Sequence, residues 1–135
     1  MEDVLPLKGI KIIWVEDDKF LGRMVSERMV KTGASPEVVS DGAKAFDAVK
    51  NTMPHIVVLD LLVPNVDGFE ILRRMKADPT TSSIPVVILS NLGQKEEIDR
   101  SKELGADDFL VKATVGLDEI VPRIQLVLSA KKAKK

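Results

Sequence analysis

Ile56-Val-Val-Leu-Asp60-Leu-Leu-Val-Pro64-Asn-Val-Asp67-Gly68 is the stretch of sequence that decides the fold. The four apolar residues before Asp60 predict a strand buried on both faces, as in a parallel sheet covered by helices. Pro64 and the polar residues after it predict an irregular loop before the next helix. Asp60 is therefore expected at the carboxyl end of a buried strand, where open α/β sheets bind their ligands.

Short apolar runs of the same kind recur along the chain, and amphipathic segments separate them. Strands are expected at residues 10–15, 37–39, 56–59, 85–89 and 109–111. Helices are expected after Asp18, after Asp41, from about Asp67, over residues 95–104 and over residues 117–128. In the first helix, Leu21, Met24, Val25 and Met29 are predicted to form one buried stripe. This alternation predicts an α/β fold, a three-layer doubly wound parallel sheet of five strands in the flavodoxin-like order 2-1-3-4-5.

Composition limits the class of protein. The 135 residues are 44% hydrophobic and 30% charged, with a formal net charge of -1 and no cysteine. We expect one domain over residues 1–135, with a core over about 10–128 and a basic tail at 129–135 that we interpret as a frayed helix end. The small net charge argues against general attraction to nucleic acids or membranes, and the lack of cysteine excludes disulfides and thiolate metal sites. Without a signal peptide or a membrane-length apolar run, the cytoplasm is the expected compartment.

Polar residues directly follow four of the predicted strands. Glu16 and Asp17 follow the first strand, Asp60 the third, Ser90 the fourth and Lys112 the fifth. The carboxyl ends of parallel strands share one edge of the sheet, so three carboxylates are expected at close range, where they need a neutralising cation. Oxygen ligands without His or Cys favour Mg²⁺, for which the backbone carbonyl of Leu62 is a further candidate ligand.

A carboxylate beside Mg²⁺, with a hydroxyl and an ammonium nearby, suits a phosphoryl acceptor. Asp60 is expected to attack phosphorus and form an aspartyl phosphate. Mg²⁺ and Lys112 would offset charge on the transferring oxygens, and Ser90 would hydrogen-bond one of them after transfer.

Four motifs carry a resemblance to a known family. They are Val15-Glu16-Asp17-Asp18, the stretch from Asp60 to Gly68, Val86-Val-Ile-Leu-Ser90, and Gly105-Ala-Asp-Asp-Phe109-Leu-Val-Lys112. Together they resemble the receiver domain of bacterial two-component response regulators, over roughly residues 10–128. The resemblance implies that Asp60 is phosphorylated, that Glu16 and Asp17 hold Mg²⁺, that Ser90 is the switch hydroxyl, and that Lys112 contacts the phosphoryl group. It also implies that Phe109 changes rotamer with the switch.

This resemblance implies a stand-alone signalling switch, similar to the chemotaxis regulators. The phosphoryl donor is expected to be a histidine kinase or a phosphotransfer protein, as in a phosphorelay. Output is expected through the surface of the fourth helix, fifth strand and fifth helix, to a protein target and not directly to nucleic acid or membrane, from a monomer or a phosphorylation-dependent dimer. The chain would catalyse its own phosphorylation and dephosphorylation without a separate output enzyme.

Two positions depart from the family pattern. Ala113 follows Lys112 where the family usually has a proline in a cis peptide, and a cis bond without proline costs roughly 3 kcal/mol. Asn91 follows Ser90 where the family favours a small residue, so it bears on access to Asp60 and on the lifetime of the phosphorylated state.

Other functions fit the residues less well. A receiver-like scaffold that binds a partner without phosphorylation remains the main alternative, although all three acidic residues are present. A phosphohydrolase of the haloacid dehalogenase type needs a second Asp two residues after the nucleophile, where Leu62 stands. A nucleotide or flavin site needs a phosphate-binding loop after the first strand, where the acids of residues 16–18 would repel phosphate unless a metal intervened.

Overall fold

Helices and strands alternate from end to end of the chain. The computed structural model describes residues 5–91, 93–112 and 114–133. The strands are β1 (Lys11–Val15), β2 (Ser35–Val39), β3 (Ile56–Asp60), β4 (Val86–Ser90) and β5 (Asp108–Val111). The helices are α1 (Lys19–Lys31), α2 (Gly42–Thr52), α3 (Gly68–Ala77), α4 (Lys95–Glu103) and α5 (Leu117–Ala133). The strands form one parallel sheet in the order β2-β1-β3-β4-β5, which confirms the predicted fold.

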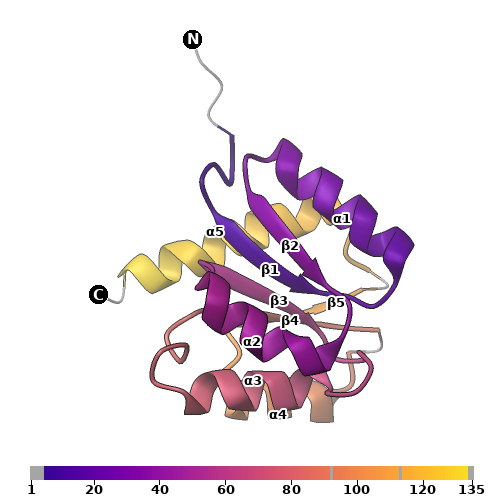
Figure 1. The fold of residues 1–135 in the computed structure, drawn as a ribbon, viewed down its shortest axis with the longest axis vertical. Coiled ribbons are helices and arrows are strands. Elements are labelled where there is room, and N and C mark those ends of the chain that lie inside the picture. Colours follow the sequence, from indigo (N-terminus) through magenta and orange to yellow (C-terminus); the bar gives the residue numbers. More distant parts are fainter. Residues whose placement is uncertain (1–4, 92, 113, 134–135) are drawn as a thin grey trace.

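Two helical layers cover the sheet, α1 and α5 on one face and α2, α3 and α4 on the other (Figure 1). Side chains alternate along each strand, so neighbouring residues of a strand enter different cores. In β1, Ile12 and Trp14 pack toward α1 and α5, whereas Ile13 and Val15 pack toward α2 and α3. This alternation also decides toward which layer a polar residue at a strand end points.

The first three helices begin at the same edge of the sheet, each behind an aspartate cap. Asp18 Oδ1 accepts the Leu21 N–H at 2.9 Å, Asp41 Oδ1 accepts the Ala43 N–H at 2.8 Å, and Asp67 Oδ1 accepts the Glu70 N–H at 3.0 Å. The helices expected after Asp18 and Asp41 begin there. With Asp18 used as a cap, Glu16 and Asp17 remain for other contacts.

The loop between β3 and α3 is held against the start of α2. The Gly42 N–H donates to the Pro64 carbonyl at 3.0 Å, and the Asn65 Nδ2 donates to Asp41 Oδ1 at 2.9 Å. A Cβ on Gly42 would lie only 1.8 Å from the Val66 carbonyl oxygen, so no larger residue fits. The loop that follows Asp60 is thus positioned by its neighbour and not only by its own sequence.

Three expectations differ from the structure. Met24 is 42% exposed, so the predicted α1 stripe is wrong at that residue, while Val25 and Met29 are buried. Leu7, which precedes the predicted core, is buried, and its N–H donates to the Thr32 carbonyl at 2.9 Å. Helix α5 continues to Ala133, five residues beyond the predicted end of the core at 128. Within the described residues, no helix has the length and apolar character needed to cross a bilayer.

Candidate functional site

The ends of β1, β3 and β5 place three charged side chains on the same side of the sheet. Glu16, Asp60 and Lys112 each continue the alternation of residues that face α1 and α5. Lys112 Nζ donates to Asp60 Oδ2 at 2.7 Å and to Glu16 Oε1 at 2.8 Å. Glu16 and Asp60 are nearly fully buried, with 2% and 3% of their surface exposed. One ammonium therefore bridges two buried carboxylates from different strands.

A third carboxylate completes an acidic cluster. Glu16, Asp17 and Asp60 each offer one oxygen, and these oxygens all lie within 4.8 Å of one another. Asp17 is exposed, so the cluster opens to solvent on its side. Three carboxylates face one ammonium at close range, which leaves an excess of negative charge. The predicted convergence of Glu16, Asp17, Asp60 and Lys112 is confirmed.

Two opposing effects act on Lys112. Its partial burial lowers the pKa of the ammonium, but the hydrogen bonds to Asp60 and Glu16 and the charges of both carboxylates outweigh burial. The net result is a pKa above the ordinary value of a lysine. Lys112 accordingly stays charged at neutral pH and provides a fixed positive charge beside Asp60.

Asp60 is also held from the loop that follows it. Its Oδ1 accepts the Leu62 N–H at 3.0 Å. The Leu62 side chain is 68% exposed, so this residue contributes its backbone to the site and not its side chain. Gly68, at the start of α3, packs so tightly on β3 that a Cβ would meet the Asp60 carbonyl oxygen at 2.8 Å. The loop thus orients the Asp60 carboxylate, and the helix start packs against the Asp60 backbone.

Ser90 ends β4, next to β3, where Asp60 pairs with Leu89. Its strand neighbours Val86 and Ile88 pack in the layer of α2, α3 and α4, and its hydroxyl is likewise directed toward α4. Ser90 Oγ donates to Glu97 Oε1 at 2.5 Å. Its Oγ also accepts the Gly93 N–H at 3.4 Å. Ser90 is thus at the predicted edge of the sheet, and its hydroxyl donates to α4 and not to the acidic cluster.

Phe109 on β5 is half-buried and packs against the same layer as Ser90. It lines a cleft of about 270 Å³ between α4 and β5 together with Ile98 and Ser101. Of the two departures from the family pattern, Asn91 is exposed beside Ser90. The peptide from Lys112 to Ala113 lies outside the described residues.

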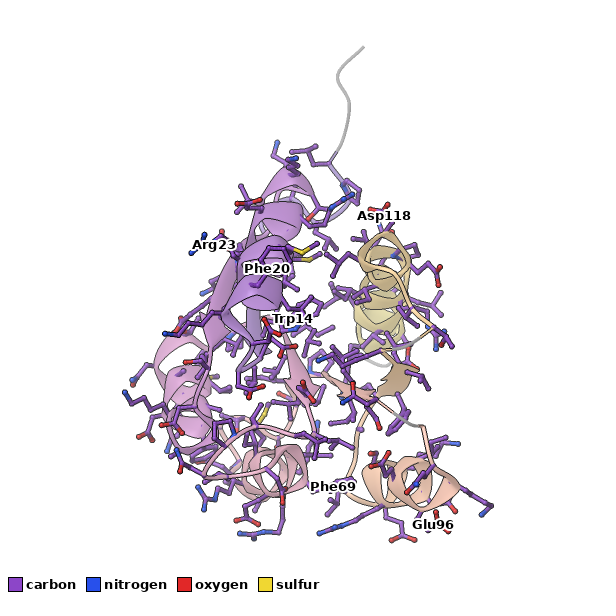
Figure 2. The ribbon with its side chains drawn as sticks, turned by 90° about the vertical axis from the view of Figure 1, so that its right-hand side faces the viewer. Trp14, Phe20, Arg23, Phe69, Glu96 and Asp118 are labelled. Atoms are coloured by element: carbon purple, nitrogen blue, oxygen red, sulfur yellow. The ribbon has the colours of Figure 1, made fainter. Side chains whose placement is uncertain are left out.

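Trp14 lies beneath the acidic cluster, between α1 and α5. It is 1% exposed and, with Glu16 and Lys112, lines a cavity of about 100 Å³. Figure 2 shows Trp14 between α1, where Phe20 and Arg23 are labelled, and α5, where Asp118 is labelled.

Sequence reasoning did not find Glu97 as the partner of Ser90. The residue lies in the first turn of α4, a helix with few apolar residues. Acidic residues are common in the first turn of a helix because their charge interacts favourably with the helix dipole. The sequence therefore gave no reason to assign a contact to Glu97 and not to Glu96.

Comparison with known proteins agrees with this fold. Residues 12–125 match the model of the response regulator receiver domain family. The gliding motility regulatory protein of Myxococcus xanthus is 35% identical over 118 residues, which are 87% of this chain and 15% of that protein. The DNA-binding dual master transcriptional regulator RpaA of Synechocystis is 31% identical over 118 residues, 87% of this chain and 48% of RpaA.

A solved structure gives the same result. The BeF3-activated N-terminal receiver domain of Klebsiella pneumoniae RstA is 28% identical, with a TM-score of 0.79 over 87% of this chain and 97% of that one. The fold and the acidic edge define a receiver module of two-component signalling, and the chain belongs to the response regulator receiver domain family. The chain spans half or less of the length of the two relatives named above.

Proposed function

We propose that this chain is a phosphorylation-dependent switch in which Asp60 accepts a phosphoryl group from a histidine kinase or a histidine phosphotransfer protein. The observation that carries the proposal is the bridge from Lys112 to Asp60 and Glu16, at 2.7 and 2.8 Å, beside a third carboxylate. A structural ion pair needs no third, exposed acid. A phosphoryl acceptor does, because the incoming group carries further negative charge.

The donor set fits Mg²⁺. Three carboxylate oxygens within 4.8 Å of one another are hard ligands, and the set holds no His or Cys. Glu16, Asp17 and Asp60 would hold the ion, with the Leu62 carbonyl as a predicted further ligand. When bound, Mg²⁺ offsets negative charge on the phosphoryl oxygens. Its double charge also matches what Lys112 leaves uncompensated among the three acids.

The chain's own residues account for the rest of the reaction. The ionised Asp60 carboxylate attacks phosphorus, and the bond between phosphorus and the donor atom breaks with its electron pair remaining on the donor. Lys112 would lie within reach of an oxygen of a phosphoryl group attached to Asp60 and would stabilise the negative charge on that oxygen. The Leu62 N–H holds the carboxylate in position, and the close packing of Gly68 on the Asp60 backbone holds the strand end, so that little reorganisation is needed.

The signal would be transmitted to a downstream protein on the side of the sheet that faces α4. Phosphorylation would bias the arrangement of α4, β5 and α5, which we propose as the surface that a downstream protein reads. The name of RpaA describes a DNA-binding regulator, and this chain matches about half of that protein. We propose that the part described here receives the phosphoryl group and passes the signal through protein contacts.

Phosphorylation by a small donor tests this function. With Mg²⁺ and acetyl phosphate, intact-mass spectrometry should show one added phosphoryl group on the wild type and none on Asp60→Asn. Asp67→Asn is a matched control, because it makes the same change close by in sequence and asparagine is also a good helix cap. It should be labelled like the wild type. Labelling of Asp60→Asn would place the acceptor elsewhere, and an unlabelled wild type would favour the scaffold interpretation.

A further inference from the structure

The hydroxyl at the end of β4 already has an acceptor. Ser90 is 3% exposed, and its Oγ donates to Glu97 Oε1 at 2.5 Å. Glu97 is the third residue of α4 and is half-buried. Glu96, the preceding residue, is exposed on the same turn (Figure 2). Of these two neighbouring acids, only Glu97 is directed at the sheet.

Strand alternation explains why this bond forms. Val86 and Ile88 place Ser90 on the side of β4 that faces α4, whereas Val58 places Asp60 on the side of β3 that faces α1 and α5. The Ser90 hydroxyl and the Asp60 carboxylate thus leave adjacent strands in different directions. The hydroxyl has to turn from the α4 side in order to reach a group attached to Asp60.

Helix α4 is lightly held, so the contact with Ser90 matters to its position. Ser101 is the only buried residue of this helix. The Arg100 guanidinium lies over the Phe69 ring of α3 at 4.3 Å, and this exposed stack is a weak tie. The cleft of about 270 Å³ between α4 and β5 leaves room for the helix to shift. A change at Ser90 can therefore be passed to α4.

We propose that Glu97 is a positioning residue that competes with the phosphoryl group for the Ser90 hydroxyl. This inference rests on the proposed phosphorylation of Asp60. A serine hydroxyl has one proton and can donate one strong hydrogen bond, so donation to a phosphoryl oxygen removes the bond to Glu97. Glu97 consequently disfavours the phosphorylated arrangement, and phosphorylation releases the first turn of α4. No covalent bond changes in this step.

Binding of beryllofluoride, a phosphoryl mimic, measures this competition directly. In Mg²⁺, isothermal titration calorimetry should show that Glu97→Ala binds beryllofluoride about fivefold to tenfold more tightly than the wild type, because a hydrogen bond to a carboxylate no longer has to be broken. Glu97→Gln keeps an uncharged acceptor and should give a smaller gain. Glu96→Ala removes a charge from the same turn and should stay within about twofold of the wild type.

A double-mutant cycle separates the proposed role from a general effect on the helix. In a Ser90→Ala background, Glu97→Ala should no longer change beryllofluoride affinity. An equal gain with and without Ser90, or no gain from either Glu97 variant, would overturn the proposal. If Glu97→Ala does not fold, as judged by circular dichroism, the same comparison is made with Glu97→Gln.

The outcome also distinguishes this inference from the proposed function. A wild type that binds no beryllofluoride would refute phosphorylation of Asp60 and the competition with it. If the wild type binds beryllofluoride and Asp60→Asn does not, the proposed function is supported. This holds even if the Glu97 variants bind like the wild type, which would refute only the role of Glu97. Hydrogen exchange adds a second measure. Glu97→Ala without ligand should exchange the first-turn amides of α4 as fast as the ligand-bound wild type.

Discussion

Lys112 and Asp60 make a direct ion pair at 2.7 Å although their strands are not neighbours. Strand β4 lies between β3 and β5, so the lysine side chain passes over the end of β4 to reach Asp60 and also Glu16, the residue that follows β1. A long side chain with several donors is suited to this span. The pair thereby connects the last strand of the fold to the first.

Replacing Lys112 should reveal how much negative charge it compensates. We expect Lys112→Met to lower the free energy of unfolding by roughly 2 to 3 kcal/mol in EDTA, because two buried carboxylates lose their cation. Mg²⁺ should restore much of the loss by neutralising the same acids. Urea denaturation with and without Mg²⁺ checks both expectations. As a control, Lys95→Met removes an exposed pair with Asp99 and should cost less than about 1 kcal/mol. Equal losses for the two variants would contradict this account.

Asp17 should matter for the metal and not for the fold. Its side chain is exposed, so Asp17→Ala is expected to keep the stability of the wild type. Losing one charge close to a divalent cation should weaken Mg²⁺ binding by about tenfold or more. Trp14, which shares a cavity with Glu16 and Lys112, provides the fluorescence readout. The control Asp47→Ala removes an exposed acid from α2, and unchanged Mg²⁺ affinity in both variants would rule out Asp17 as a ligand.

Glu70 should account for part of the loss of folding stability at low pH. Hydrogen bonds from Arg73 and Arg74 lower the pKa of this carboxyl from 4.5 to about 2. Since the folded pKa lies below the unfolded one, the contribution to stability is present above about pH 4.5 and is lost as the pH falls toward 2. Glu70→Gln should therefore lose less stability than the wild type over this range. The midpoints of urea unfolding of both proteins at pH 7, 4 and 3 test this prediction. Equal losses of stability in Glu70→Gln and the wild type would contradict it.

Gly42 should not tolerate a side chain. A Cβ there would lie 1.8 Å from the Val66 carbonyl oxygen, so Gly42→Ala has to displace the loop that follows Asp60. We expect a loss of about 1 to 3 kcal/mol in the free energy of unfolding, together with slower phosphorylation by acetyl phosphate. Gly116→Ala is the matched control, because no described residue apart from its chain neighbours lies within 4 Å of its Cβ position. A stable and fully active Gly42→Ala would show that the loop adapts freely.

Much of the fold and part of the site were predictable because the signals are local. Buried parallel strands are short apolar runs, and Asp60 and Lys112 each stand at the end of such a run. Once the strands are parallel, their polar ends must share one edge. The convergence of Glu16, Asp17, Asp60 and Lys112 therefore followed from the order of elements, without knowledge of side-chain positions.

What could not be predicted depends on contacts between distant segments. Leu7 lies outside the apolar runs that predict strands; its N–H donates to the Thr32 carbonyl at the end of α1, and its side chain packs in the core between the sheet, α1 and α5. Met24 is spaced like a core residue, yet Val25 and Met29 already fill the contact between α1 and the sheet, which leaves Met24 at the margin. The bond from Ser90 to Glu97 requires the exact position of α4, a helix whose own sequence gives it little apolar surface.

The alternation of side chains in β1 also limits how this fold can vary during evolution. Trp14 and Glu16 point to one layer, and Val15 enters the other. Deleting or inserting a single residue in β1 would exchange these sides, turning the carboxylate of Glu16 away from Lys112 and an indole into the wrong layer. Related chains should therefore differ in length in their connecting loops, such as residues 78–85, while the first strand keeps its length. An insertion in that strand would be tolerated only if two residues were added together, because two residues restore the alternation of side chains.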